Sequence, residues 1–247
     1  MRPLLRLLIT GLLSSTLFQS CVPDRITGTT LVNGDTVYTT RPNSDPDGTG
    51  RFYMGREIAP VMSHSGVGWL ERSEREEEER TDILLNELHL DPNDVVADIG
   101  AGSGYYTFRL APLVPRGSVL AVDIQPEMIE VLLDSAEAKG VHNVQPVLGE
   151  IDDPKLAAGV VDLVLLVDAY HEFSHPFEMM SKLYRALKPG GRVALVEYRG
   201  EDPSVPIKPR HKMTQAQAIK EMEAVGLTWV ETKSMLPQQH LMIFEKK

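Results

Sequence analysis

A glycine-rich segment and an acidic residue downstream of it carry the clearest chemical pattern in this sequence. Asp98 is followed by glycines at three alternate positions, Gly100, Gly102 and Gly104. Glycines in a turn between a strand and a helix let the backbone approach a ligand closely. Asp123 ends the next expected strand, where a carboxylate can accept hydrogen bonds from ribose hydroxyls. The pattern therefore predicts a site for a cofactor that contains a nucleoside.

The spacing of these glycines disfavours a nicotinamide dinucleotide. A dinucleotide-binding loop reads GxGxxG, and its third glycine would fall at Tyr105. A large side chain there opposes close packing over a pyrophosphate. The Asp98 carboxylate would also repel a pyrophosphate, whereas it would attract a cationic amino or sulfonium group. An NAD-dependent oxidoreductase is thus a disfavoured alternative.

The segment His-Glu-Phe-Ser-His at residues 171–175 matches the zinc-protease pattern HExxH. In such a protease one helix presents both histidines to one metal. Here the motif precedes Pro176, and a residue before proline disfavours helical angles. We therefore expect a loop here, with a helix beginning near Pro176, and we assign no metal. A non-protease metal site is an alternative, with ligands drawn from His171, Glu172, His175, His211 and His240.

Segments typical of strands and helices alternate from residue 51 onward. The expected strands are 94–99, 117–123, 143–148, 161–167, 192–198, 227–233 and 241–245. The expected helices are 74–90, 103–113, 126–139, 176–187 and one that opens at Thr214 with capping-box spacing to Gln217. The charged run 74–80 should be a solvated helix face, and 188–191 a turn. Such alternation predicts a parallel sheet with helices on both faces and a ligand site beyond the carboxyl ends of its strands.

Five motifs together resemble the class I S-adenosylmethionine-dependent methyltransferases. They are VVADIGAGSGYY (95–106), VLAVDIQPEM (119–128), the segment around VLGEIDDP (147–154), VDLVLLVDAYHEF (161–173) and LKPGGRVALVEY (187–198). The resemblance covers about residues 74–247. It implies a Rossmann-like α/β fold with a seven-stranded, mostly parallel sheet of order 3-2-1-4-5-7-6, its last strand antiparallel. It also implies S-adenosylmethionine as the cofactor.

The resemblance further implies roles for single residues. The glycine loop and the acid before it would bind the methionine part of the cofactor, Asp123 would bind ribose, and the segment with Glu150 and Asp152 would edge the adenine. Asp168 would face the site of methyl transfer. The implied cofactor-binding residues are thus Asp98, Gly100, Gly102, Gly104, Asp123, Glu150, Asp152 and Asp168.

The residues beyond the fourth strand are the candidates for catalysis. His171 is the first choice as base or substrate orienter because imidazole exchanges protons near neutral pH, and Tyr170 and Glu172 adjoin it. Secondary candidates are Glu197, Tyr198, Arg199 and His211. Residues that could line an acceptor pocket are Tyr53, Met54, Arg56, His64 and Trp69.

The N-terminus resembles a bacterial lipoprotein signal. Arg2 and Arg6 precede a mostly apolar run at 7–18, which is too short to span a bilayer comfortably, and Cys21 follows it. We expect residues 1–21 to be a signal peptide, with export to the cell envelope and a lipid anchor at Cys21. The alternatives are an ordinary cleaved signal, an uncleaved anchor or a cytosolic start. Residues 22–50 should be a flexible linker because they have few large apolar side chains. The methyltransferase domain would span 51–247, with a helical extension at 51–90.

Composition narrows the class of partner. Lys and Arg number 25 and Asp and Glu 35, a formal net charge of −10, which disfavours nucleic acid as a partner. The sequence has one cysteine, so arsenic-type methyltransferases, which use cysteine thiolates, are also disfavoured. We expect a small-molecule or lipid-like methyl acceptor. A sensor or pseudo-enzyme that binds the cofactor without turnover is the alternative, because the supply of cofactor outside the cytosol is unexplained.

Overall fold

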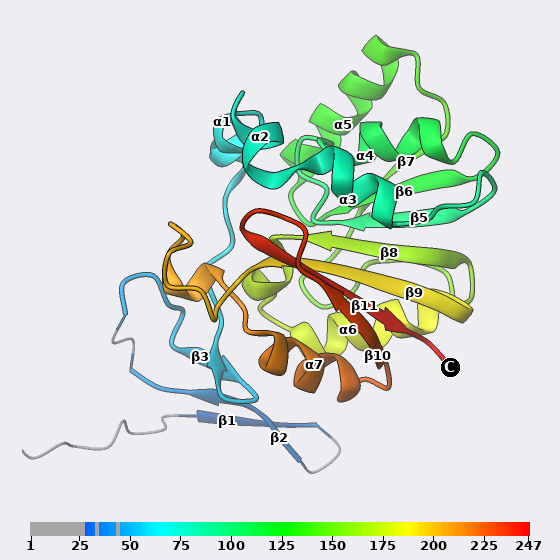
Figure 1. Cartoon of the computed structure of the whole chain (residues 1–247). Coiled ribbons are helices and arrows are strands. Elements are labelled where there is room, and N and C mark those ends of the chain that lie inside the picture. Colours follow the sequence, from blue (N-terminus) through cyan, green and yellow to red (C-terminus); the bar gives the residue numbers. More distant parts are fainter. Residues whose placement is uncertain (1–27, 33–34, 43–44) are drawn as a thin grey trace, which may run out of the picture.

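Two β-sheets organise residues 28–32, 35–42 and 45–247, the part of the chain that the computed structural model describes (Figure 1). The larger sheet has the spatial order β7-β6-β5-β8-β9-β11-β10. Its strands are β5 (Val95–Ile99), β6 (Ser118–Asp123), β7 (Val144–Leu148), β8 (Val161–Val167), β9 (Leu187–Tyr198), β10 (Thr228–Lys233) and β11 (Gln239–Glu245). Strand β11 alone runs opposite to the direction of the other six strands. Counted along this sheet alone, the order is 3-2-1-4-5-7-6, which confirms the predicted topology.

Helices cover both faces of this sheet, as predicted (Figure 1). On one face lie α3 (Thr81–Glu87), α4 (Thr107–Leu110) and α5 (Pro126–Lys139), and on the other lie α6 (Pro176–Ala186) and α7 (Gln215–Glu223). Neighbouring residues of β8 point to opposite faces, so Leu163 and Leu165 pack with the first group and Val164 and Leu166 with the second. A strand covered on both faces needs apolar side chains throughout, which explains the continuous apolar run in β8.

Local sequence features correctly predicted where two of the helices begin or end. Helix α5 begins at Pro126 and ends before Gly140, whose φ of 62° lies in the left-handed region that glycine tolerates. The Thr214 side chain caps α7 by accepting a hydrogen bond from the Gln217 backbone N–H at 3.2 Å. Both boundaries follow from residue types visible in the sequence.

Three local predictions were wrong. The helix expected at 74–90 is divided into α2 (Arg75–Glu79) and α3 because Arg80 has a left-handed φ of 52°. The helix expected at 103–113 shortens to α4 and the 3₁₀ turn η2 (Ala111–Leu113), since glycines with positive φ hold the preceding segment out of helical conformation. The turn expected at 188–191 lies within β9, where the backbones of Gly190 and Gly191 exchange hydrogen bonds with Lys246.

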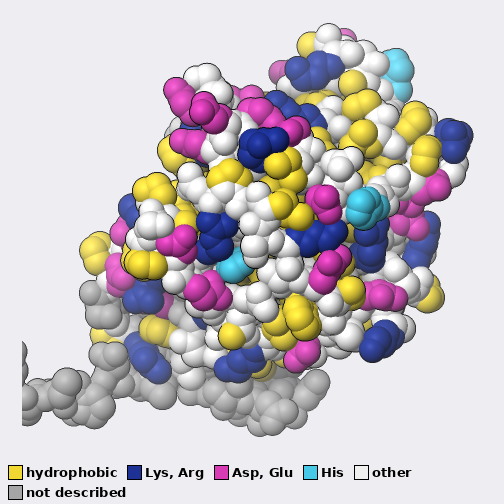
Figure 2. Space-filling model, viewed as in Figure 1, with side chains coloured by type: hydrophobic (Ala, Val, Ile, Leu, Met, Phe, Trp, Pro, Cys, Tyr) yellow, Lys and Arg dark blue, Asp and Glu magenta, His cyan; other side chains and the backbone are white. Residues whose placement is uncertain are grey.

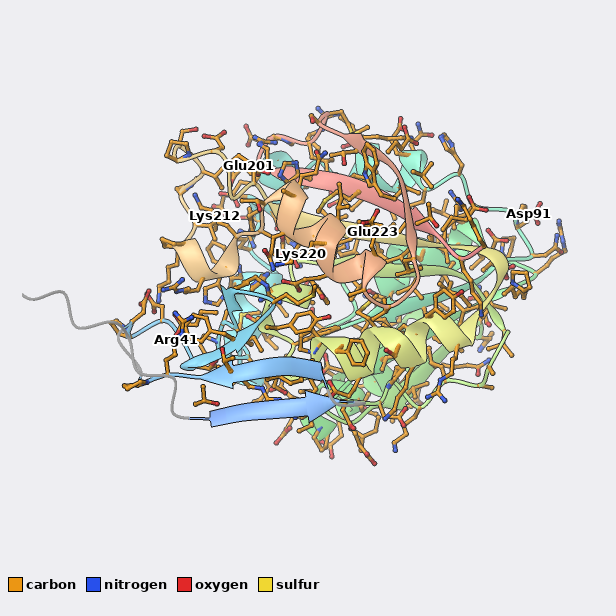
Figure 3. All side chains as sticks on the ribbon, turned by 90° about the horizontal axis from the view of Figure 1, so that it is seen from below. Arg41, Asp91, Glu201, Lys212, Lys220 and Glu223 are labelled. Atoms are coloured by element: carbon orange, nitrogen blue, oxygen red, sulfur yellow. The ribbon has the colours of Figure 1, made fainter. Side chains whose placement is uncertain are left out.

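The smaller sheet corrects the predicted linker. Its antiparallel strands are β1 (Gly28–Val32), β2 (Asp35–Thr40), β3 (Arg51–Tyr53) and β4 (Arg56–Glu57), so much of 22–50 is sheet and the extension at 51–90 begins with strands. Tyr38 and Tyr53 are buried with Ile58, which supplies the apolar anchor that we did not anticipate. Tyr38 Oη donates to a carboxylate oxygen of Glu178 in α6 at 2.5 Å. Seen from below, the small sheet lies beside the α6–α7 layer, and Lys220 of α7 donates to the Met54 carbonyl (Figure 3).

The extension continues with the 3₁₀ turn η1 (His64–Gly66), then α1 (Val67–Leu70) and α2. Acidic side chains gather on the surface over α1 and α2 in Figure 2. The predicted signal peptide and Cys21 lie outside the described residues. Within the described ranges, no helix combines the length and apolar character that a bilayer crossing requires.

Candidate active site

A cavity of about 580 Å³ opens at the carboxyl ends of β5, β6 and β8. Gly100 and Gly102 reach it from the loop after β5, Asp123 from the end of β6, and Asp168 from the residue after β8. This is the edge of a parallel sheet at which ligands bind in doubly wound folds. Four of the eight predicted cofactor-binding residues therefore line one cavity.

The glycines of the loop have two different structural roles. Gly100 and Gly102 have φ values of 75° and 56°, and a Cβ on either would lie 2.9 Å from a neighbouring side-chain carbon. Their missing side chains let the backbone form the cavity wall. Gly104 does not line the cavity. A Cβ there would lie 2.4 Å from Phe108 and 2.8 Å from Leu132, so this glycine serves the packing of α4 against α5.

Asp123 ties the loop to the next strand. Its side chain is nearly buried, with Oδ2 accepting from the Gly102 N–H and Oδ1 from the Gln125 N–H, both at 2.9 Å. Burial raises the pKa of this carboxyl, and the backbone N–H donors oppose that rise. Each carboxylate oxygen retains acceptor capacity, so Asp123 can shape the loop and still receive hydrogen bonds from a ligand.

Asp98 is not at the cavity. Its carboxylate is buried, Thr107 Oγ1 donates to its Oδ2 at 2.6 Å, and burial raises its pKa to about 6. Glu150 and Asp152 also point elsewhere, because they form exposed ion pairs with Lys155 and Lys182. Ile151, between these two acids, lines the cavity instead. The segment predicted to edge the adenine thus reaches the cavity through Ile151 and not through its two acidic side chains.

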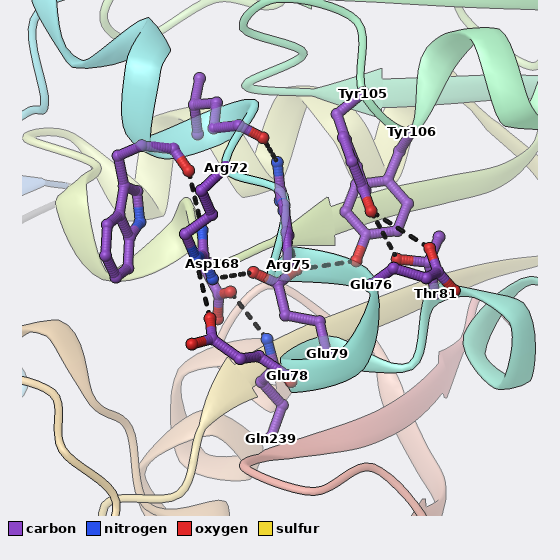
Figure 4. Close-up of polar contacts among 12 residues, drawn as sticks. Arg72, Arg75, Glu76, Glu78, Glu79, Thr81, Tyr105, Tyr106, Asp168 and Gln239 are labelled. Atoms are coloured by element: carbon purple, nitrogen blue, oxygen red, sulfur yellow. Dashed lines mark hydrogen bonds and ion pairs between the residues drawn. The ribbon is translucent and has the colours of Figure 1, made fainter.

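Asp168 is half-buried at the cavity wall and has a left-handed φ of 48°. Gln239 Nε2 donates to its Oδ2 at 2.9 Å, while its Oδ1 has no hydrogen-bond partner within the described ranges (Figure 4). Burial, together with the nearby carboxylates of Glu79 and Glu197, raises the pKa of Asp168 well above its usual range. Within the described ranges, this buried oxygen is thus free to form a hydrogen bond with a bound molecule.

Arg75 and Glu79 also line the cavity, but they were not predicted as site residues because their charged run was expected to face solvent. Both side chains are buried instead, and Glu79 Oε2 accepts from Arg75 Nε at 3.0 Å and from Tyr106 Oη at 3.1 Å. Arg72 Nη2 donates to the other oxygen of Glu79 at 2.9 Å (Figure 4). The four-residue spacing of Arg75 and Glu79 was the available signal, since such pairs share a helix face.

The HExxH segment is not on one helix, which confirms the predicted loop. His171 and Glu172 belong to the 3₁₀ turn η3 (Tyr170–Glu172), and α6 begins at Pro176. His171 Nδ1 lies 2.6 Å from Glu197 Oε2, and its Nε2 lies 3.1 Å from Nδ1 of His211, which ends the 3₁₀ turn η4 (Pro209–His211). His171, Glu172 and His211 all line the cavity.

The remaining candidates divide between the cavity and other surroundings. Tyr198 and Trp69 line the cavity. Tyr170 is buried away from it and donates to Glu221 Oε2 at 2.7 Å. The other candidates have contacts away from the cavity. Arg56 binds Glu221, His64 is in an exposed ion pair, His175 binds Ser174, Arg199 binds backbone carbonyls and His240 binds Glu201. Tyr53 and Met54 pack in the core of the small sheet.

Comparison with known proteins relates the central part of this chain to methyltransferases. Residues 96–191 match the family model described as a methyltransferase domain, and they include the glycine loop, Asp123 and Asp168. An uncharacterized methyltransferase-like protein of Schizosaccharomyces pombe is 35% identical over 126 residues, which is 51% of this chain and 46% of that protein. Together with the sheet order, these matches support a class I S-adenosylmethionine-dependent methyltransferase domain in this chain.

Two further comparisons fit the methyltransferase domain. An arsenite methyltransferase of Halobacterium salinarum is 34% identical over 105 residues, 42% of this chain and 27% of that protein. The crystal structure of an S-adenosylmethionine-dependent methyltransferase from Aquifex aeolicus superposes with a TM-score of 0.71 at 22% identity, covering 76% of this chain and all of that one. The structural likeness concerns the fold. The chain spans less than half the length of either of these two curated relatives.

The cofactor of such domains is S-adenosylmethionine, and the cavity has the features needed to hold it. Gly100 and Gly102 leave room at the wall, Asp123 offers a carboxylate acceptor, and Asp168 Oδ1 offers a polar atom that has no partner among the described residues. Apolar side chains beside Asp123 complete a surface suited to a flat base, namely Val122, Ile124, Met128 and Ile151.

Proposed function

We propose that this protein transfers a methyl group from S-adenosylmethionine to a small apolar or lipid-like molecule. The observation that carries this proposal is the composition of one cavity. A wall suited to a nucleoside, with Gly102 and Asp123, adjoins a polar cluster around His171 and an apolar mouth. The cofactor, when bound, supplies a methyl group on a sulfonium that a nucleophilic atom of the acceptor can take up. The protein supplies orientation and a cavity shielded from water.

The apolar mouth supports an apolar acceptor. Val61, Trp69 and Ile151 line the cavity, and each keeps about half of its side-chain surface exposed. Exposed apolar side chains grouped at a cavity mouth are typical of sites that receive an apolar ligand. The cavity adds further apolar lining on its acceptor side from Phe173, Pro206 and Ile207. The net charge of −10 disfavours polyanionic acceptors.

The polar cluster supports an acceptor that must be oriented or deprotonated. Glu197 is buried and accepts from His171 Nδ1, which fixes the imidazole and leaves Nε2 on the cavity side. Glu172 offers a carboxylate on the same wall. An oxygen-bearing head group attached to an apolar body would match both parts of this surface. An arsenical acceptor fits poorly because the only cysteine in the sequence is Cys21.

Methyl transfer can be tested with labelled S-adenosylmethionine, the full-length protein and two acceptor sets. One set is a lipid extract with apolar phenols and quinols, and the other is polar amines, nucleotides and peptides. We expect label in the first set only, and a His171→Ala variant that binds the cofactor but transfers at least about 100-fold more slowly. Transfer to the polar set alone would contradict the acceptor class. Cofactor binding without transfer to either set would favour a sensor.

Export and lipid anchoring remain part of the proposal. They rest on the residues of the N-terminal segment, in which two arginines precede an apolar run and Cys21 follows it. An anchor of this kind would keep the cavity close to a membrane. Proximity to lipid would suit an acceptor that dissolves poorly in water.

A further inference from the structure

We propose that His171, Glu172 and His211 bind a divalent transition-metal ion at the wall of the cavity. His171 Nε2 lies 3.1 Å from His211 Nδ1, and Glu172 Oε1 lies 3.9 Å from the first atom and 3.6 Å from the second. A triangle with these sides has a point about 2.1 Å from all three corners, which matches zinc–nitrogen and zinc–oxygen bonds of about 2.0–2.2 Å. The three atoms therefore surround a place of the right size for a metal ion.

The types of ligand fit a metal that is open to solutes. Two imidazoles and one carboxylate hold catalytic zinc and non-haem iron in proteins, and both sites leave coordination positions free. All three residues line the cavity, so the free positions would face the space where the acceptor binds. On the proposed function, the ion would hold an oxygen atom of the acceptor. The metal site itself does not depend on that function.

Hydrogen bonds from neighbouring groups orient the atoms of His171 and Glu172 that would bind the metal. Glu197 Oε2 lies 2.6 Å from His171 Nδ1, and Glu197 Oε1 accepts from the His171 backbone N–H at 3.2 Å. A carboxylate on the remote ring nitrogen leaves Nε2 as the coordinating atom and fixes the ring, as in carboxylate–histidine–zinc arrangements. The Met62 N–H donates to Glu172 Oε2 at 3.0 Å, which leaves Oε1 on the side of the histidines.

Hydrogen bonding alone does not account for the cluster. A proton shared between His171 and His211 satisfies that pair, but Glu172 Oε1 at 3.6 and 3.9 Å is too far from either nitrogen for a hydrogen bond. Two carboxylates, Glu172 and Glu197, lie beside the histidines. The nearby guanidinium of Arg56 forms a two-bonded pair with Glu221. A divalent cation would balance the negative charge and join all three ligands.

Metal binding can be measured without any methyl acceptor. Full-length protein stripped with a chelator is titrated with Zn²⁺ by calorimetry and with Co²⁺ by visible absorption. We expect one equivalent of each, and cobalt d–d bands of a low-coordinate nitrogen and oxygen site. His211→Ala and Glu172→Gln should each weaken Zn²⁺ binding at least about 10-fold, and Glu197→Gln by about 10- to 100-fold. His175→Ala is the matched control, because His175 belongs to the HExxH segment and lies outside the cluster; it should leave affinity unchanged.

Binding of S-adenosylmethionine by the same variants separates this proposal from the proposed function. His211→Ala should retain cofactor affinity, which also shows that the variant folds. The metal site is refuted if the stripped protein binds neither ion stoichiometrically, or if His211→Ala and Glu172→Gln bind as tightly as the unchanged protein. Loss of metal binding in His175→Ala would point to other ligands and refute it equally. A protein that binds metal but not cofactor would contradict the proposed function alone.

Discussion

Arg75 Nε lies 3.0 Å from Glu79 Oε2, one turn further along the same short helix, and both side chains are buried (Figure 4). Arg75 Nη1 also donates to the Leu70 carbonyl at 2.8 Å. The pair thereby joins the helical extension to the buried groups around Asp168, whose pKa Arg75 lowers and Glu79 raises. Tyr106, which lies outside the extension, donates to Glu79 Oε2 at 3.1 Å, so polar contacts help to hold the extension beside the cavity.

Arg75→Leu should destabilise the protein by about 3–5 kcal/mol, because Glu79 would remain buried without this cation. Chemical denaturation at neutral pH measures the loss. The double variant Arg75→Leu/Glu79→Leu should recover part of it, since no carboxylate is then left uncompensated. A double variant that is less stable than Arg75→Leu would show that Glu79 depends mainly on Arg72 and Tyr106.

Asp98 should make stability depend on pH between about 4 and 6. Burial disfavours its charged form and raises its pKa from an ordinary value of 3.8 to about 6 in the folded protein. Over this interval the folded protein binds the proton more tightly than the unfolded chain, so the contribution of Asp98 to stability falls as pH rises. The full shift corresponds to about 3 kcal/mol.

Asp98→Asn removes this titration while an amide oxygen can still accept from Thr107. The stability of the variant relative to the unchanged protein should rise from pH 4 to pH 6 and stay level above pH 6. Denaturant unfolding at four pH values gives this difference directly. A difference that is constant with pH would mean that Asp98 is not desolvated in the folded protein.

Gly104 and Gly140 both have positive φ, yet only Gly104 is enclosed. Gly140→Ala should cost about 1 kcal/mol, the strain of a left-handed alanine. Gly104→Ala should cost a further 1–3 kcal/mol, roughly, because its Cβ would overlap Phe108 and Leu132. Thermal unfolding of the two variants compares these costs. Equal losses would contradict the packing role of Gly104.

The sequence predicted those elements of the fold whose position is set by a few neighbouring residue types. The apolar run of β8 and the boundary at Gly140 are of this kind. Sheet order came from the resemblance of several motifs rather than from any one element. The break at Arg80 was not visible, because a left-handed arginine has no sequence signature. The small sheet was missed because its contacts with the rest of the domain are remote in sequence, such as the hydrogen bond from Tyr38 to Glu178, which lies 140 residues away.

In the site, too, some features could be predicted from local sequence and others depend on the folded chain. The glycine loop and Asp123 were predictable because adjacent strand ends of a parallel sheet meet at one edge. The direction in which a side chain points was not, as Asp98 and Tyr170 demonstrate. His171 and His211 are 40 residues apart, and only the folded chain brings their ring nitrogens to 3.1 Å. No periodicity connects η3 to η4, so the sequence could name both histidines among five possible metal ligands but could not single out this pair.

Cys21→Ser should release the protein from membranes if the cysteine carries a lipid. Cell fractionation followed by detergent-free extraction compares the variant with the unchanged protein. We expect the unchanged protein in the membrane pellet and the variant in the soluble fraction, because the lipid chain supplies the membrane affinity. A variant that still sediments with membranes would contradict lipidation.

The central claim is that the cavity at Asp123 binds S-adenosylmethionine. Calorimetric titration of the full-length protein with S-adenosylmethionine and S-adenosylhomocysteine tests it most directly. We expect binding of both. Asp123→Ala should weaken it by about 1–3 kcal/mol through loss of a charged acceptor, and the control Asp152→Ala, whose side chain lies outside the cavity, should leave it unchanged. Binding of neither compound, or equal affinity for Asp123→Ala and the unchanged protein, would contradict the account.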